Sequence, residues 1–260
     1  MRDRPTALIT GASAGIGKDL AHVFAENRFD LIITARTQGA LEKLASELSA
    51  NHKVQVEIIV RDLAYPTAPD EIYRKVKEQG VSLDVLVNNA GFGTHGPFAT
   101  TDVKQIQDML EVNITALTML TRLFLPDMLE RKRGRIMNVA STAGFQPGPL
   151  MAEYYASKAY VLSLSEAIAT EVERSGVTVT ALCPGPTTTE FQKRAGIENT
   201  RLFQRTSMSS MDVARTGFEG MMHGKRIVIP GIKNKVLVQS VRVGPRKWVA
   251  DVVKKLNATR

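Results

Sequence analysis

The chain alternates short apolar runs with longer stretches whose apolar positions recur every three or four residues. The apolar runs have the length of buried strands, and we expect strands at residues 6–10, 31–35, 54–60, 83–87, 135–139, 177–183 and 226–229. Helical spacing follows Gly17 and predicts further helices at residues 39–50, 69–79, 102–131 and 152–175. Continuous apolar strands that alternate with helices predict an α/β fold with a doubly wound parallel sheet. Ligands of such sheets bind at the carboxyl ends of the strands.

Composition is that of an ordinary soluble globular protein. Hydrophobic residues make up 43% of the 260 residues and charged residues 23%, so one large domain can form a substantial core. The single cysteine, Cys183, cannot form an internal disulfide, and no apolar run reaches the ~20 residues of a membrane span. The short polar start shows no signal peptide, so we expect an intracellular, cytoplasmic protein.

The formal net charge of +8 admits three kinds of partner: nucleic acid, an anionic membrane or a polyphosphate ligand. No zinc-finger, helix-turn-helix or aromatic RNA-binding signature is present, which argues against nucleic acid. We expect no metal site either. The candidate chemistry lies instead at the ends of the predicted strands.

A glycine turn joins the first strand to the first helix. Its glycines are Gly11, Gly15 and Gly17, with Ser13 and Ile16 between them. A strand, a glycine turn and a helix together point backbone N–H groups at a pyrophosphate, although many strand-to-helix turns contain glycine for conformational reasons alone.

The second strand ends at Arg36. An acidic residue near this point holds the ribose 2′-hydroxyl of NAD, whereas an arginine accommodates the 2′-phosphate of NADP. The sequence has no acid here and therefore favours NADP, the alternative being a solvated loop arginine.

Polar and small residues also follow the third and fourth strands. Asp62, with Leu63 beside it, is placed to hold the adenine amine, or simply to cap a local turn. Asn89 offers fixed amide hydrogen bonds, and the small Ala90 and Gly91 allow a ribose to approach; a plain turn favours the same residues.

Asn113 stands in the middle of the helix predicted at residues 102–131. Asparagine is a poor interior helix residue because its amide competes with the backbone. We weigh a local bend and a functional water site equally at this position.

Ser141 follows the fifth strand, and Tyr154 and Lys158 lie four residues apart on the next helix, which places them on one face. A phenol is a poor acid or base at neutral pH. We expect the Lys158 ammonium to lower the pKa of Tyr154 toward the operating range, while Ser141 binds the oxygen that gains negative charge. The spacing of Tyr154 and Lys158 also occurs by chance on many helices.

Taken together, these residues resemble the short-chain dehydrogenase/reductase family over roughly residues 5–230. The resemblance rests on T-G-A-S-A-G-I-G, D-L, N-N-A-G, Y-x-x-x-K and P-G-x-x-x-T, which begin at Thr10, Asp62, Asn88, Tyr154 and Pro184. It implies a seven-stranded Rossmann fold and a nicotinamide dinucleotide, with a catalytic tetrad of Asn113, Ser141, Tyr154 and Lys158.

The resemblance also assigns roles within this site. Tyr154 would protonate the carbonyl oxygen, Lys158 would also hold the nicotinamide ribose, and Asn113 would support a water relay. Pro184, Gly185, Thr187 and Thr189 would complete the cofactor site, the two threonines contacting the carboxamide and pyrophosphate. Ala14 lacks the second basic charge that some NADP-preferring members carry at this position.

Beyond the sixth strand we expect a polar, irregular substrate lid at about residues 186–210. Apolar residues suggest a hydrophobic substrate pocket, although they could simply pack the lid on the core: Phe92, Phe145, Leu150, Met151, Phe191, Leu202 and Phe203. We divide the chain into a catalytic domain, residues 1–230, and a basic amphipathic extension, residues 231–260, broken at Gly244 and Pro245. The extension fits an anionic membrane surface, a groove on its own domain or a second subunit.

The sequence therefore predicts an NADP(H)-dependent oxidoreductase that interconverts a small-molecule ketone or aldehyde and an alcohol, acting on a hydrophobic substrate. Two alternatives stay open: a catalytically silent NADP-sensing protein, and a membrane-associated 3-oxoacyl-type reductase of lipid precursors. The family resemblance further implies a homodimer or homotetramer formed through two long helices.

Overall fold

The computed structural model describes residues 4–198, 200 and 207–258, and its centre is a seven-stranded parallel sheet. The strand order is β3-β2-β1-β4-β5-β6-β9, so the chain reverses direction along the sheet between β1 and β4. The strands are β1 Thr6–Thr10, β2 Asp30–Ala35, β3 Val56–Val60, β4 Val85–Asn88, β5 Gly134–Val139, β6 Val177–Leu182 and β9 Ile227–Val228. This arrangement confirms the predicted doubly wound sheet, with strand ends shifted by one or two residues.

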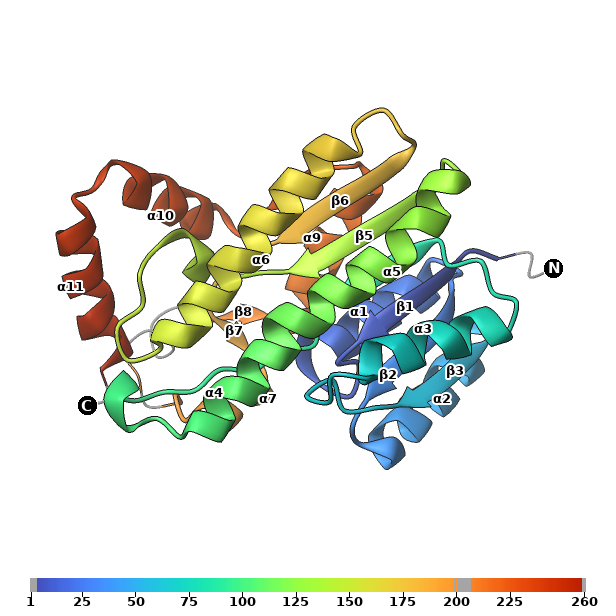
Figure 1. Cartoon of the computed structure of the whole chain (residues 1–260), viewed down its shortest axis with the longest axis horizontal. Coiled ribbons are helices and arrows are strands. Elements are labelled where there is room, and N and C mark those ends of the chain that lie inside the picture. Colours follow the sequence, from blue (N-terminus) through green and yellow to red (C-terminus); the bar gives the residue numbers. More distant parts are fainter. Residues whose placement is uncertain (1–3, 199, 201–206, 259–260) are drawn as a thin grey trace.

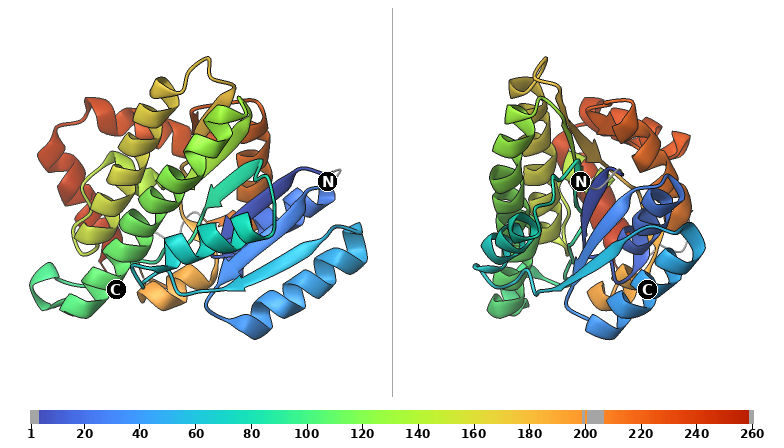
Figure 2. Two further views of the ribbon diagram at one scale, coloured as in Figure 1. Left: turned by 45° about the vertical axis from the view of Figure 1, so that its right-hand side comes forward. Right: turned by 90° about the vertical axis from the view of Figure 1, so that its right-hand side faces the viewer.

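Helices cover both faces of the sheet, as the end-on view in Figure 2 shows. One face packs against α1 Gly15–Glu26, α2 Gln38–His52 and α9 Ser210–Met222. The other packs against α3 Ala68–Glu78, α5 Leu117–Glu130 and the C-terminal end of α6 Ala152–Glu171. Sequence patterning assigned no element to the segment that forms α9.

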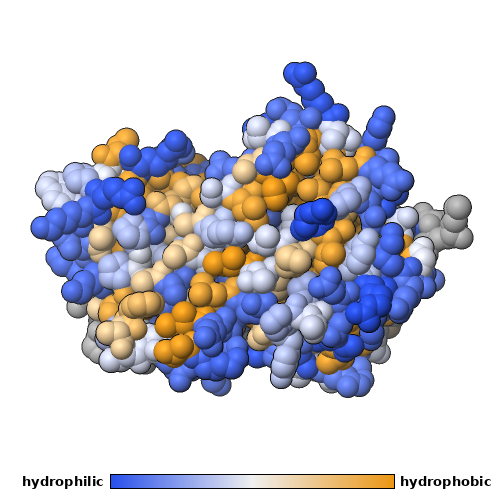
Figure 3. All heavy atoms as spheres, viewed as in Figure 1, coloured by the Kyte–Doolittle hydropathy of each residue, from blue (hydrophilic) through white to orange (hydrophobic). Residues whose placement is uncertain are grey.

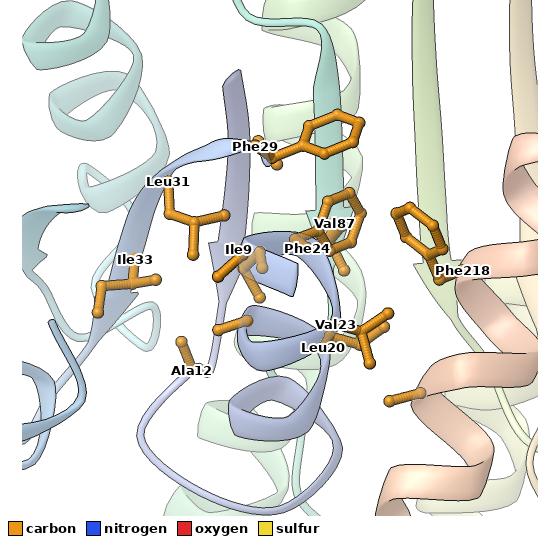
Figure 4. Close-up of a cluster of buried hydrophobic side chains, with 14 of the residues drawn as sticks. Ile9, Ala12, Leu20, Val23, Phe24, Phe29, Leu31, Ile33, Val87 and Phe218 are labelled. Carbon is orange, nitrogen blue, oxygen red and sulfur yellow. The ribbon is translucent and has the colours of Figure 1, made fainter. Parts of the chain in front are cut away.

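Successive residues of a strand pack into two hydrophobic cores, one on each face of the sheet. Ile9 on β1 faces the α1 side, whereas its neighbour Leu8 faces the α3 side. On the first side Phe24, Phe29 and Phe218 meet edge to face, with ring centroids 4.9 to 6.1 Å apart (Figure 4). These contacts fix α1 and α9 against the sheet and thereby hold the first turn of α1 at the strand ends.

The helix predicted at residues 102–131 is not a regular α-helix throughout. It consists of α4 Val103–Leu110, a π-helical segment Glu111–Ala116 and α5. Asn113 lies inside the π-helical segment, so the structure shows the local distortion that was one of the two explanations for this residue. Such wide turns occur frequently at functional sites.

The described parts of the lid contain regular elements where an irregular loop was expected. Residues of its first part form β7 Thr187–Thr188 and the short helix α7 Glu190–Ala195, and β7 pairs in parallel with β8 Met208–Ser209. The Thr189 hydroxyl caps α7 by accepting a hydrogen bond from the Phe191 amide at 3.2 Å. Leu202 and Phe203, expected in this lid, lie outside the described residues.

The extension forms two helices, α10 Ile232–Val243 and α11 Arg246–Asn257, which are separated at Gly244 and Pro245 as predicted. Figure 1 shows them in red, folded back beside the start of α6. Val238 and Val253 are buried, and Asn257 Nδ2 donates to the Pro149 carbonyl at 3.0 Å. Of the three proposed contacts for this extension, the structure shows packing on its own domain.

Within the described part of the chain, no helix combines the length and apolar character that crossing a bilayer would require.

Candidate active site

One cavity of about 470 Å³ runs along the carboxyl ends of the strands. It brings together most of the residues that the sequence predicted for a cofactor site and the three reactive side chains. These lining residues are Gly11, Ser13, Gly15, Ile16, Arg36, Asp62, Leu63, Asn89, Ala90, Gly91, Ser141, Tyr154, Lys158, Pro184, Gly185, Thr187 and Thr189.

Two predicted site residues, Gly17 and Asn113, do not line this cavity. Gly17 instead packs against the glycine turn: a Cβ on this residue would stand 2.3 Å from Asn89 Nδ2 and 2.4 Å from the Gly11 carbonyl oxygen. Only a glycine lets helix α1 approach the turn this closely. Gly17 therefore shapes the glycine turn rather than facing a ligand.

The glycine turn owes its shape to backbone conformations that glycine adopts without strain. Gly11 has a φ of 66° and Gly15 a φ of 54°. The turn is fixed to the fourth strand, because Asn89 Nδ2 donates to the Thr10 carbonyl at 2.9 Å. The Thr10 hydroxyl in turn accepts from the Asn89 and Ala90 amides at 3.0 Å each. The first turn of α1 carries no acidic residue, so its free N–H groups can receive an anion.

A positive side chain stands at the far end of the cavity. The Arg36 side chain is 63% exposed, and its Nη1 lies 3.7 Å from Asp62 Oδ2. Asp62 also accepts a hydrogen bond from the Ala64 amide at 3.0 Å. The exposed guanidinium retains free donors that can bind a phosphate in a bidentate manner.

Ser141, Tyr154 and Lys158 converge at the opposite end. Ser141 Oγ hydrogen-bonds the Tyr154 side chain and also lies 3.3 Å from the Pro184 carbonyl oxygen. Lys158 is 5% exposed, and its Nζ donates to the Val139 carbonyl at 2.8 Å and lies 5.8 Å from the centre of the Tyr154 ring. The serine, phenol and amine thus share one wall of the cavity, as the spacing predicted.

The expected lowering of the tyrosine pKa is not what the structure shows. Burial raises the pKa of Tyr154, and the opposing hydrogen bond with Ser141 does not compensate for it. Burial also lowers the pKa of Lys158 to about 8, against the opposing effect of the nearby Cys183. Burial removes the water that would stabilise the tyrosinate of Tyr154 and the ammonium of Lys158. The energetic cost of this desolvation exceeds the electrostatic attraction between the two groups that the sequence analysis assumed.

Asn113 is fully buried and has a clear structural role. Its Nδ2 donates to the Phe92 carbonyl at 2.9 Å and to Ser157 Oγ at 3.0 Å, and its Oδ1 accepts from the Phe92 amide at 3.1 Å. These bonds join the loop after β4 to α6. A Cβ on Gly91 would stand 3.0 Å from Asn113 Oδ1 and 3.4 Å from Lys158 Nζ, which places the asparagine next to the lysine.

Three of the apolar candidates for a substrate pocket, Phe92, Met151 and Phe191, line the cavity, whereas Phe145 and Leu150 do not. The Phe191 ring on lid helix α7 lies 5.2 Å from the Tyr154 ring, centre to centre. The lid therefore packs directly over the phenol.

Among the lining residues that the sequence analysis missed are Gln146, Tyr155 and Leu237. Leu237 comes from α10, and no local pattern could place the extension there. The Tyr155 hydroxyl donates to Asn257 Oδ1 at 3.3 Å, so the second tyrosine of the pair anchors the extension. The Tyr154 side chain instead hydrogen-bonds Ser141.

This geometry agrees with comparisons to known proteins. The family model for short chain dehydrogenases matches residues 5–200, and the chain belongs to that family. A very-long-chain 3-oxoacyl-CoA reductase of Phaeosphaeria nodorum is 35% identical over 214 residues, which cover 79% of this chain and 62% of that protein. The chain thus spans about three-fifths of the length of this relative.

Two solved structures extend the similarity to the whole fold. A short-chain dehydrogenase from Sphingobium yanoikuyae in complex with NADPH is 32% identical, with a TM-score of 0.83 and coverage of 92% of this chain and 93% of that one. A bulky-bulky ketone specific alcohol dehydrogenase from Comamonas testosteroni is 30% identical, with a TM-score of 0.78 and 92% of both chains covered.

Proposed function

We propose that this protein is an NADP(H)-dependent oxidoreductase that interconverts a ketone or aldehyde and the corresponding alcohol and that its substrate is hydrophobic. The observation that carries this proposal is the single cavity that joins a glycine turn and an arginine to the Ser141, Tyr154 and Lys158 group. A nicotinamide dinucleotide fits such a cleft, because its pyrophosphate requires an anion site and its nicotinamide ring must lie beside the reactive side chains.

The side chains and backbone groups of the cavity fit such a cofactor. The glycine turn and the N-terminus of α1 would hold the pyrophosphate, and Arg36 would bind a 2′-phosphate. Asp62 would accept from the adenine amine, and Lys158 would hold the nicotinamide ribose. The relative from Sphingobium yanoikuyae is described in complex with NADPH, which supports the choice of NADP over NAD.

When bound, NADPH would supply the hydride that adds to the carbonyl carbon of the substrate. As negative charge develops on the carbonyl oxygen, the Ser141 hydroxyl stabilises it by a hydrogen bond. Tyr154 then donates its phenolic proton to this oxygen, which gives the alcohol. The raised pKa of Tyr154 keeps the phenol protonated at neutral pH, the form required for reduction. Lys158 stabilises the phenolate left behind, and Asn113 supports the loop beside it.

Replacement of Tyr154 by phenylalanine tests this function. We expect kcat for NADPH-dependent reduction of a ketone panel to fall by about 10²- to 10⁴-fold, while NADPH binding is retained. Tyr160→Phe is the matched control, because this tyrosine lies on the same helix and is 40% exposed. A wild-type protein that binds NADPH but reduces no carbonyl compound would instead support the silent sensing protein.

A more specific second candidate is reduction of a 3-oxoacyl compound. The similarity to the Phaeosphaeria nodorum reductase favours it, as do the apolar residues beside Tyr154. Association of this protein with membranes is a separate proposal, which rests on the basic extension and its exposed Trp248. Sedimentation of the wild-type protein with anionic liposomes, compared with Trp248→Ser, would test that association.

The proposed homodimer or homotetramer would form through α5 and α6. Apolar atoms gather over these helices on the face seen in Figure 3, where Met119 is 38% exposed. Light scattering of the purified protein would establish the number of subunits, and Met119→Glu should lower it.

A further inference from the structure

A second cavity of about 250 Å³ lies between α10 and α11 of the extension. Its walls are formed mainly by valine and leucine side chains with Trp248 among them. The residues from the extension that line it are Leu237, Ser240, Val241, Gly244, Pro245, Trp248, Val249, Val252, Val253 and Leu256.

This groove adjoins the candidate active site. Gln146, Tyr155 and Leu237 line both cavities, so the two share a wall one residue away from Tyr154. Tyr155 is itself held in place by Asn257 at the end of α11. A ligand chain that extends from the phenol past Leu237 would therefore reach the space between the two helices.

The groove suits a particular kind of ligand group. Among the described residues that line it, none carries a charge, although the outer surfaces of α10 and α11 are basic. Few side-chain polar groups face the space, chiefly those of Gln146, Ser240 and Tyr155. A peptide strand would leave its backbone amides and carbonyls without enough partners there, whereas an alkyl chain needs none.

We infer that the groove between α10 and α11 binds the alkyl chain of a long-chain ketone substrate whose carbonyl group lies at Tyr154. This inference rests on the proposed reductase function and adds the class of substrate to it. A methylene has about the volume of a water molecule, ~30 Å³, so 250 Å³ holds a chain of about eight carbons. Each methylene that is buried raises kcat/KM by about fourfold.

A pair of 3-oxo esters tests the inference: ethyl 3-oxohexanoate and ethyl 3-oxotetradecanoate, which differ only in chain length. With NADPH and wild-type enzyme, kcat/KM for the longer ester should exceed that for the shorter by more than about tenfold, because two buried methylenes suffice for this ratio. Val252→Glu places a carboxylate in the groove at a position that is 56% exposed, so the fold should tolerate it. This variant should bring the ratio close to one.

Val236→Glu is the matched control, since it makes the same substitution within α10 at a position that is 63% exposed and outside the groove. It should keep the wild-type ratio. Equal kcat/KM values for the two esters, or a ratio that Val252→Glu does not change, would overturn the inference. Absence of turnover with either ester would instead count against the proposed function.

Binding can be followed without turnover, because Trp248 is the single tryptophan of the chain and lines the groove. Below its aggregation concentration, the longer ester should shift the tryptophan emission to the blue in a saturable manner, and the shorter ester should not. Val252→Glu should abolish the shift. If phospholipid vesicles or an increase in protein concentration produce the shift and the longer ester does not, the groove belongs to a membrane or a subunit interface and the inference is wrong.

Discussion

Replacement of Lys158 by methionine should make the protein more stable at neutral pH while it destroys the proposed activity. The amine is 5% exposed, and its burial lowers the pKa from 10.5 to about 8. Between these two values the unfolded chain binds a proton that the folded chain does not bind. The free energy of unfolding therefore rises with pH across this window, and below it the buried charge destabilises the fold by a constant amount.

The size of this effect follows from the shift. A difference of about 2.5 pKa units, at ~1.4 kcal/mol each, corresponds to about 3 kcal/mol at pH 7. Methionine removes this cost but also loses the hydrogen bond from Nζ to the Val139 carbonyl, worth about 1 kcal/mol. We expect Lys158→Met to be more stable than the wild type by about 2 kcal/mol at pH 7. The advantage should disappear as the pH approaches 10.

Urea denaturation of both proteins between pH 7 and pH 9.5 measures this difference. Lys43→Met serves as the control, because Lys43 is exposed on α2 and its replacement should change little. A Lys158→Met protein that is less stable than the wild type at pH 7 would refute the reasoning. A stability difference that stays constant across the pH range would refute it equally.

Four further predictions concern the cofactor site and the extension. Arg36→Ala should raise the Kd for NADPH at least about tenfold and leave that for NADH nearly unchanged, as titration by fluorescence would show. Gly17→Ala should weaken NADPH binding similarly because the added methyl group overlaps the glycine turn, whereas Gly39→Ala, with nothing within 4 Å, should bind normally. Asn257→Ala removes one buried and one partly buried hydrogen bond and should lower the free energy of unfolding by about 2 kcal/mol in urea denaturation. The rate of ketone reduction should be constant below pH 7 and fall as the pH passes about 8, where Lys158 loses its proton.

The parts of the fold that were predicted correctly are those determined by short stretches of consecutive residues. Apolar runs identified the strands, and the residues after each run were placed at one edge because parallel strands end together. The chain-order positions of Gly11, Asn89 and Ser141 were therefore enough to predict a shared cavity. The short strand β9 was also found in this way.

The parts that were missed depend on contacts between distant segments. The Tyr155 hydroxyl meets Asn257 across 102 positions of the sequence, and Leu237 reaches the cavity only because α10 folds back over it. The pKa of Tyr154 was misjudged for a similar reason, since the sequence shows the lysine four residues away but not the burial that dominates. The π-helical turn around Asn113 was foreseen only as one of two explanations.

The adjacent residues Tyr154 and Tyr155 connect the candidate active site to helix α11. Tyr154 faces the cavity, and the next residue holds α11 through its hydroxyl group. A change in the position of α11 would therefore act on the residue next to the proposed proton donor. The extension and the candidate active site are in this way connected through adjacent residues of α6.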